Sequence, residues 1–265
     1  MSSSGAGHSG AIALAQRHDR RAHPHPEWVA ALTGASGPEV ARALRDIDRH
    51  VAEETEIHQR LHDGGRSFYA QIRSPLDLYA IARLARPDAV VETGVSSGIS
   101  SAHFLMALQD SRRGRLFSID LPTRQRGPKL GARESPVSLP PGRSTGWAVP
   151  DRLRRRWDLR IGPSQTLLPG AATDAGTIGV FLHDSLHTPR HLAFELATIA
   201  PRLAPGAVVM ADNTTWTGRA FDRFAESLGA PVVRCGRSDL VGLRVPTDGP
   251  PATGRRRTGR LRTTR

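Results

Sequence analysis

From residue 89 onward, short apolar runs alternate with longer amphipathic segments, and this alternation restricts the possible folds most strongly. We predict strands at the apolar runs and helices where apolar residues recur with the helical period. The expected strands lie at 89–94, 115–122, 158–162, 177–185 and 207–213, and the expected helices at 100–110, 150–157, 188–203 and 218–229. Strands that alternate with helices predict a doubly wound, mostly parallel sheet.

The last two expected strands, 231–236 and 240–246, have no helical segment between them. Strands joined by a short connection pair antiparallel, so we expect a hairpin at the sheet edge. The predicted fold class is therefore α/β, with a doubly wound, mostly parallel, seven-stranded Rossmann-like sheet that ends in an antiparallel hairpin.

The length of 265 residues suits one domain, which we expect to span residues 27–246. Helical patterns at 37–61 and 74–87, the second with Ser74 as its N-cap, predict that 27–73 is a helical N-terminal extension. Three segments lie outside the regular pattern. We predict a disordered N-terminal segment at 1–26, an insertion at 123–149 and a disordered basic tail at 247–265.

The formal net charge is +12, and the last twelve residues contribute six arginines and no acidic residue. Such a tail can bind nucleic acid through phosphate contacts. No recognisable nucleic-acid module accompanies it, so we favour a solvated tail and expect no nucleic-acid partner. The single cysteine, Cys235, excludes an intrachain disulfide, and neither a signal peptide nor a membrane span is apparent. We therefore expect a cytoplasmic protein without a membrane partner.

Polar and small residues gather where the expected strands end, which is where ligands bind in doubly wound sheets. The first strand runs into GVSSG, residues 94–98, whose glycines let a ligand lie against the backbone before a helix N-terminus. The spacing is not GxGxxG, and the lysine of a P-loop is missing. Asp120 ends the next strand, where a carboxylate can accept both hydroxyls of a ribose.

Two later strand ends carry Asp184 and the pair Asp212-Asn213. Two carboxylates and an amide oxygen from adjacent strand ends form a site of hard oxygen ligands, which suits Mg²⁺.

In this order, ETGVSSGIS, SID, GPSQ, HDSLH and ADNTTW resemble the motifs of class I S-adenosylmethionine-dependent methyltransferases. The similarity, over residues 74–246, is greatest to metal-dependent small-molecule O-methyltransferases of the catechol and caffeoyl-coenzyme A type and their bacterial relatives. The resemblance implies S-adenosylmethionine and Mg²⁺ as cofactors and a small hydroxylated metabolite as substrate. Enzymes of this kind often pair, so a homodimer is compatible with it.

By this resemblance, GVSSG holds the methionine part of the cofactor, with Glu92 and Ser100 near its amino and carboxylate groups. Asp120 takes the ribose hydroxyls. The implied cofactor-binding set is Glu92, Gly94, Ser96, Gly98, Ser100, Asp120, Asp184, and Ser164 and Gln165, which flank the adenine. The implied metal ligands are Asp184, Asp212 and Asn213, and His187 stands near the position of the family's general base.

The HDSLH segment departs from the family pattern, in which the acid follows VFL directly. His183 intervenes, and a slip of one residue reverses the face to which a strand residue points. Asp184 therefore needs a bulge or a different strand end to reach the metal, or His183 replaces it. His187 stands in place of a lysine, and a metal-ligand or structural role is equally open for it. We expect His191, one helical turn further on, at the surface or on a helix face.

Other functions remain open at this level. A metal-independent methyltransferase would use His187 alone as base, with Asp212 and Asn213 positioning the substrate. An RNA-binding or RNA-modifying protein would use the basic tail and the arginines at 152–156, but the chain lacks an NPPY-type motif. A nicotinamide-dependent reductase would bind NAD or NADP instead. Trp147 and Trp216 are candidates for a substrate-facing aromatic surface, although core packing is favoured for both.

Overall fold

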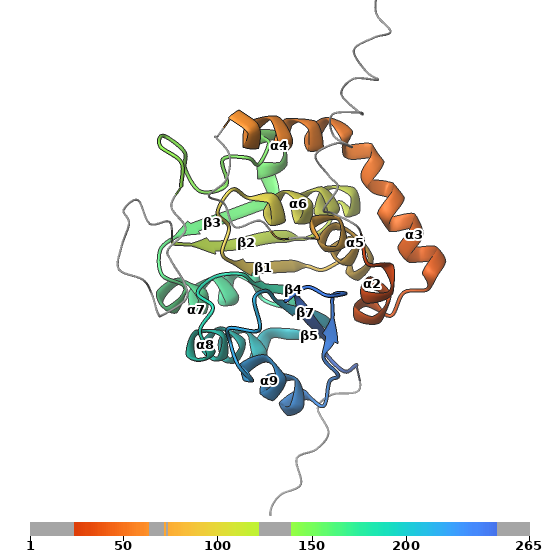
Figure 1. Ribbon diagram of the computed structural model, residues 1–265, viewed down its shortest axis with the longest axis vertical. Helices are drawn as coiled ribbons and strands as arrows, with labels where there is room; N and C mark the ends of the chain where they lie inside the picture. The colour runs from red at the N-terminus through yellow and green to blue at the C-terminus, as the bar shows by residue number, and fades with distance from the viewer. Residues whose placement is uncertain (1–23, 64–71, 73, 122–138, 248–265) are drawn as a thin grey trace, which may run out of the picture.

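The computed structural model describes residues 24–63, 72, 74–121 and 139–247 (Figure 1). Within them, seven strands form one sheet in the order β3-β2-β1-β4-β5-β7-β6. The strands are β1 (Ala89–Thr93), β2 (Arg115–Asp120), β3 (Trp157–Ile161), β4 (Ile178–His183), β5 (Leu203–Ala211), β6 (Val233–Arg234) and β7 (Val241–Arg244). β1 to β5 are parallel, and β7 runs antiparallel to both β5 and β6. The predicted sheet with its terminal hairpin is confirmed.

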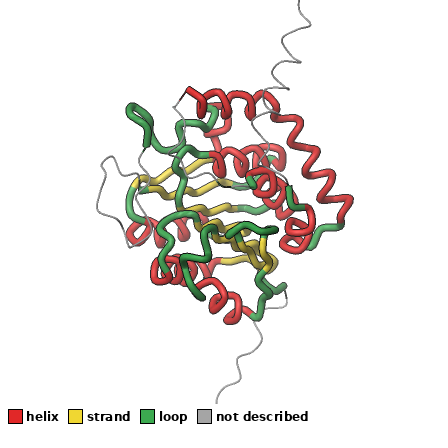
Figure 2. The backbone as a smooth tube through the Cα atoms, viewed as in Figure 1, coloured by secondary structure: helices red, strands yellow, loops and turns green. Residues whose placement is uncertain are grey.

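Helices cover both faces of this sheet (Figures 1 and 2). They are α2 (Pro26–Thr33), α3 (Gly37–Asp46), α4 (Val51–Asp63), α5 (Pro75–Ala85), α6 (Ile99–Ser111), α7 (Ser164–Ala175), α8 (Pro189–Ile199) and α9 (Ala220–Leu228). Three 3₁₀ turns join them to their neighbours: η1 (Ile47–His50), η2 (Asp151–Arg156) and η3 (Ala200–Arg202). None of these described helices has an apolar stretch long enough to span a membrane.

Side-chain alternation along the buried strands divides the interior into two cores. Val90 of β1 joins the core formed with α2, α3, α5 and α6, and its neighbour Val91 joins the core formed with α7, α8 and α9. Because successive strand residues point to opposite faces, a strand buried on both sides is apolar throughout. This explains the apolar run at 89–91 with which β1 begins, before the buried polar residues Glu92 and Thr93.

The helices differ from the sequence pattern at several points. The helix expected at 37–61 is broken by η1 into α3 and α4, and neither α2 nor α7 was anticipated. α7 contains Pro169 in its interior. Proline usually breaks a helix, so the sequence did not predict a helix here. Ser74 precedes α5 as predicted, but its side chain makes no capping hydrogen bond to that helix.

The segments expected to be irregular lie largely outside the described residues. This applies to residues 1–23, 122–138 and 248–265. The prediction of a disordered segment at 1–26 is wrong at its end, because 24 and 25 lead into α2, which begins at Pro26. The second part of the insertion, 139–149, is also described.

The strand register aligns the ends of four strands. Thr93 of β1 pairs with Ile119 of β2 and with His183 of β4, and His183 pairs with Ala211 of β5. The residues that follow these partners therefore form a level row across the carboxyl edge of the sheet: Asp120, Gly94, Asp184 and Asp212.

Gly94 occupies the crowded centre of this row. Its φ is +87°, and a Cβ added there would overlap the carbonyl oxygen of Asp184. Gly142 offers a matched comparison, because its φ is +75° and no described atom lies within 4 Å of the added Cβ.

We predict that Gly94→Ala lowers the free energy of unfolding more than Gly142→Ala does. The left-handed backbone alone costs an alanine about 1 kcal/mol. The overlap at Gly94 adds about 1–3 kcal/mol, as overpacking does in other cores. Urea titrations of both variants measure the difference through their midpoints. Equal losses would contradict the close approach of Gly94 to Asp184.

Candidate active site

The GVSSG loop connects β1 to α6, and its two glycines are required by protein contacts on both sides. Gly94 lies against the Asp184 carbonyl. At Gly98, where φ is +94°, an added Cβ would lie 2.5 Å from a Val149 methyl group and 3.0 Å from the Gly146 Cα. The absence of side chains therefore lets the chain itself approach the loop, in addition to any ligand.

The second part of the insertion packs onto this loop. The Gly146 N–H donates to the Ser96 carbonyl at 2.8 Å, and the Ala148 N–H donates to the Ser97 carbonyl at 3.0 Å. Trp147, between them, is buried in the core with α5 and α6, so core packing is its observed role. The insertion thus fixes the conformation of the glycine loop.

Asp120 holds the other side of the loop. Its Oδ1 accepts a hydrogen bond from the Val95 N–H at 3.2 Å, and its Oδ2 accepts from the Thr145 hydroxyl at 2.8 Å. Burial raises the pKa of Asp120, although these hydrogen bonds oppose the shift. The backbones of Ser96 and Leu121 also form hydrogen bonds with this carboxylate, which therefore faces the start of the GVSSG loop.

Glu92 lies beneath the loop and is fully buried. Its Oε1 accepts hydrogen bonds from the hydroxyls of Ser101 and Ser118, while its Oε2 has no hydrogen-bond partner among the described residues. Burial raises the pKa of Glu92 to about 7, against the effect of hydrogen bonds from Ser101, Ser118 and Ser100. An unpaired buried carboxylate oxygen is costly, so this atom is a natural acceptor for a bound donor.

Asp184, Asp212 and Asn213 come together with His187 at the ends of β4 and β5. The His187 Nε2 lies 3.4 Å from the Asp184 Oδ1 and 3.5 Å from the Asn213 Nδ2. Burial raises the pKa of Asp212 to about 6, and the charge of Asp184 contributes to the same shift. The sequence correctly predicts that these residues share one edge.

The side chains at the ends of β4 and β5 do not form a compact set of metal ligands. Among the described residues, Asp184, His187 and Asp212 do not bring one ligand atom each to within 4.8 Å of one another.

His183 does not share the position of Asp184. It is fully buried, and its Nδ1 lies 2.7 Å from the Glu195 Oε2. Asp184 reaches the edge because it follows the last paired residue of β4; the irregularity in the β4–β5 ladder is at Ile178 and Val180, at the opposite end. Of the two sequence alternatives, Asp184 faces His187 and His183 faces the interior.

Glu195, which the sequence patterns did not single out, lies at the centre of a buried polar network below the site. It accepts hydrogen bonds from the hydroxyls of Thr93 at 2.6 Å and Ser185 at 3.0 Å, and it pairs with His183 and, at 2.9 Å, with His191. Burial opposes its ionisation, but these two histidines hold the pKa of Glu195 well below its usual range. The available signal was a glutamate one turn after a histidine on the apolar face of a helix.

Ser164 and Gln165, expected beside the adenine, begin α7 and contact the same network. The Ser164 hydroxyl lies 3.0 Å from the His191 Nε2, and the Gln165 Nε2 lies 3.0 Å from the His191 Nδ1. His191, expected at the surface or on a helix face, is buried and joins α8 to α7.

Trp216 follows the end of β5 and is 39% exposed. Its ring lies edge-on to His187 with 6.0 Å between the ring centroids. Of the two tryptophans singled out from the sequence, this one can form an aromatic wall beside His187.

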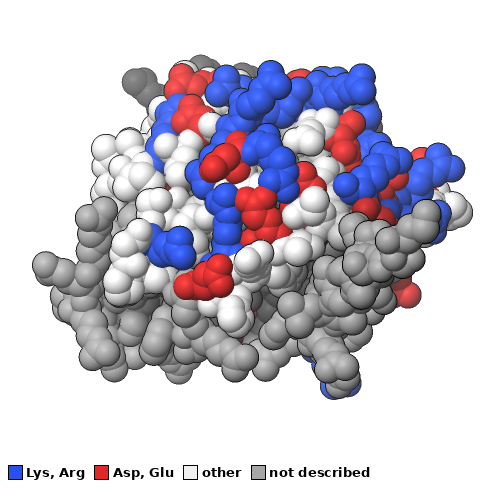
Figure 3. Space-filling model, turned by 90° about the horizontal axis from the view of Figure 1, so that it is seen from above, with Lys and Arg blue, Asp and Glu red and all other residues white. Residues whose placement is uncertain are grey.

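Three of the four arginines at 152–156 make intramolecular contacts: Arg152, Arg154 and Arg156. Arg152 pairs with Glu53 and Glu56, and Arg154 donates to backbone carbonyls and lies 5.1 Å from the centroid of the Trp157 ring. In Figure 3, basic and acidic side chains are interspersed on the face shown. This cluster therefore gives no support to nucleic-acid binding.

Comparison with known proteins places the site within a recognised domain. Residues 91–214 match a family described as a methyltransferase domain, and this range contains the whole row from Gly94 to Asp212. No protein with curated annotation shows significant sequence similarity to the chain.

Several solved structures share the fold. The O-methyltransferase from Bacillus cereus in complex with SAH is 12% identical, with a TM-score of 0.51 over 72% of this chain and 90% of that one. TomG, an O-methyltransferase from Streptomyces achromogenes involved in tomaymycin synthesis and solved with SAM, is 18% identical, with a TM-score of 0.50 over 74% and 89%. The O-methyltransferase NovP is 17% identical, with a TM-score of 0.51 over 72% and 88%.

At these identities the solved structures establish the fold, and the family match covers the loop and strand ends that form the site. The domain match identifies residues 91–214 as a methyltransferase domain, and the seven-stranded sheet around it has the Rossmann-like fold of the solved methyltransferases.

Proposed function

We propose that the protein methylates a hydroxyl oxygen of a small molecule with the assistance of Mg²⁺, and that His187 is the general base. The observation that carries this proposal is the level row of Asp120, Gly94, Asp184 and Asp212, with His187 beside Asp184. The solved structures described as O-methyltransferases make oxygen the first acceptor to test.

The residues around the glycine loop suit the methyl donor. Bound S-adenosylmethionine supplies an electrophilic sulfonium methyl group. The unpaired Glu92 Oε2, with Ser100 and Asp184 nearby, would accept hydrogen bonds from its ammonium group. Asp120, at the end of β2, would accept hydrogen bonds from the ribose hydroxyls. Gly94, Ser96 and Gly98 would line the methionine part, and Ser164 and Gln165 would flank the adenine.

The donor set on the other side suits a hard divalent cation. Asp184, Asp212 and Asn213 offer only oxygen ligands from adjacent strand ends, which is the preference of Mg²⁺. Bound Mg²⁺ would supply positive charge that favours deprotonation of a substrate hydroxyl.

His187 is placed to receive the hydroxyl proton. Its Nε2 faces Asp184 and Asn213, and the Asp184 carboxylate would stabilise the ring once it is protonated. Trp216 would form an aromatic wall against the substrate, which brings the hydroxyl into register with the methyl group.

One observation favours a second candidate, the metal-independent methyltransferase. The Asp184–His187 pair, at 3.4 Å, is by itself the arrangement of an oriented general base. In this alternative, Asp212 and Asn213 position the substrate.

We predict that the protein binds S-adenosylhomocysteine and that Asp120→Asn weakens this binding about 10- to 100-fold, through loss of charged hydrogen bonds to the ribose. Asp88→Asn is the control, because Asp88 is exposed and lies before the opposite end of β1. Isothermal titration calorimetry measures both. Absence of binding to the unmodified protein would contradict the proposed cofactor site.

Removal of divalent cations is expected to abolish methyl transfer and to leave S-adenosylhomocysteine binding intact. Turnover is measured with methyl-labelled S-adenosylmethionine and a panel of catechols, phenols and sugars. Asp212→Asn should reproduce the loss, because it removes one of the two carboxylates. Turnover that persists in excess chelator would reject Mg²⁺ assistance and favour the metal-independent candidate.

His187→Gln should lower kcat about 10²- to 10⁴-fold, the usual contribution of general acid–base catalysis. S-adenosylhomocysteine affinity should not change, because His187 faces the substrate side. His62→Gln is the control, since the His62 side chain is 70% exposed and lies on α4. An unchanged kcat in His187→Gln would show that another group takes the proton.

A further inference from the structure

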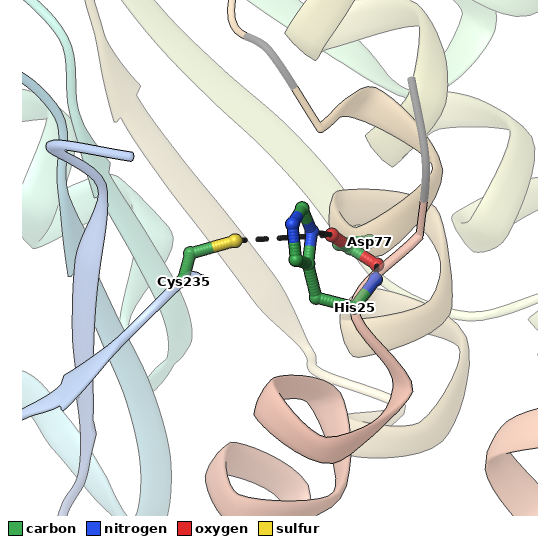
Figure 4. A group of neighbouring side chains, drawn as sticks. All are labelled: His25, Asp77 and Cys235. Atoms are coloured by element: carbon green, nitrogen blue, oxygen red, sulfur yellow. Dashed lines mark hydrogen bonds and ion pairs between the residues drawn. The ribbon is translucent and has the colours of Figure 1, made fainter. Parts of the chain in front are cut away.

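Three residues that are distant in sequence meet on the side of the sheet covered by α2 and α5. His25 immediately precedes α2, Asp77 lies in the first turn of α5, and Cys235 directly follows β6. Figure 4 shows their side chains directed toward one another. One ligand atom of each lies within 4.8 Å of the others, and among the described residues no other group of three His, Cys, Asp or Glu does so.

Asp77 is the common neighbour of the other two side chains. Its Oδ2 lies 2.8 Å from the His25 Nδ1 and 4.0 Å from the Cys235 Sγ. Ligands of tetrahedral Zn²⁺, with bonds of about 2.0–2.3 Å, stand about 3.3–3.8 Å apart. The two observed separations lie on either side of this range, so small side-chain shifts admit a cation between the three atoms.

The cluster is mostly buried and reaches solvent at His25. Asp77 and Cys235 are fully buried, while the His25 side chain is 33% exposed. The second carboxylate oxygen, Asp77 Oδ1, accepts a hydrogen bond from the His25 N–H at 2.8 Å. This bond fixes the orientation of the carboxylate, as hydrogen bonds to metal ligands commonly do.

A second observation comes from Ser74, at the N-cap position of α5. It makes no capping hydrogen bond to the helix, although serine is among the preferred capping residues. Its Oγ instead lies 3.4 Å from the His25 Nδ1 and 3.8 Å from the Cys235 Sγ. A fourth potential ligand is therefore turned toward the same point. Ser74 also forms a side-chain hydrogen bond with Asp77, so all four side chains meet in one cluster.

We propose that His25, Asp77 and Cys235 form a second metal site that binds Zn²⁺, with the Ser74 hydroxyl or a water molecule as fourth ligand. One thiolate, one imidazole and one carboxylate suit Zn²⁺ and do not suit Mg²⁺. When the Zn–S bond forms, the S–H bond of Cys235 breaks and its proton passes to the buffer. Neutral His25 would bind through the Nδ1 lone pair with its ring proton on Nε2. The site links α2 and α5 to the β6–β7 connection and does not depend on the proposed methyl-transfer function.

Co²⁺ as a substitute for Zn²⁺ gives a direct test. The chain contains one cysteine, so thiolate-to-cobalt charge-transfer absorption reports on Cys235 alone. The other histidines of the chain can bind Co²⁺ but cannot produce this band. Titration of the reduced full-length protein with cobalt chloride should give the band with one equivalent per chain, together with the intense visible absorption of tetrahedral Co²⁺. Added Zn²⁺ should remove both. Absence of the band at saturating Co²⁺ would overturn the proposal.

Substitutions separate the cluster from adventitious binding to the thiol. Cys235→Ala should abolish the band, and His25→Gln and Asp77→Asn should each weaken Co²⁺ binding at least about 10- to 100-fold. His62→Gln is the matched histidine control, and Asp212→Asn must keep the band if the two metal sites are separate. An unchanged Co²⁺ affinity in His25→Gln would overturn the proposal. His25→Gln also serves if the variants at buried positions fail to fold, because His25 is partly exposed and its folding can be checked by circular dichroism.

Discussion

The approach of the Gly94 backbone to the Asp184 carbonyl is the contact on which the geometry of the site depends. The Asp184 N–H donates to the Thr93 carbonyl at 2.8 Å, so the ends of β1 and β4 remain paired up to this contact. Because the register continues to β2 and β5, the same pairing sets the level of Asp120 and Asp212. A side chain at residue 94 would separate the two strand ends, and the GVSSG loop would move away from Asp184 and His187.

The buried Glu195 supports this edge from below. It bonds to Thr93 at the end of β1, to His183 at the end of β4 and to His191 on its own helix, α8. A buried carboxylate is tolerated only where its charge and lone pairs are satisfied. Ser185 is the fourth side chain that bonds to Glu195. The network therefore resists displacement of either strand end. His187 stands above it, with 5.5 Å between its ring centroid and that of His183.

The sequence predicts the sheet and the row of acids because both follow from local patterns: apolar runs mark strands, and parallel strands end at one edge. It does not predict what the small residues of GVSSG adjoin, since Asp184 and Val149 approach from segments far along the chain. Pro169 lies inside α7, and a proline in the sequence argues against a helix, so α7 was not predicted. Periodicity places His191 on α8, but it cannot show that His191 pairs with the buried Glu195, because such pairs depend on packing.

The two proposed metal sites differ in the chemistry of their ligands, and this difference decides how chelation can be interpreted. Asp184, Asp212 and Asn213 offer oxygen alone, whereas the cluster of His25, Asp77 and Cys235 offers sulfur and nitrogen as well. A strong chelator empties both sites, and loss of Zn²⁺ would loosen α2 from the β6–β7 connection next to β5. A fall in turnover therefore belongs to the oxygen site only if Mg²⁺ alone restores it. Recovery that requires Zn²⁺ would instead connect catalysis to the docking of α2.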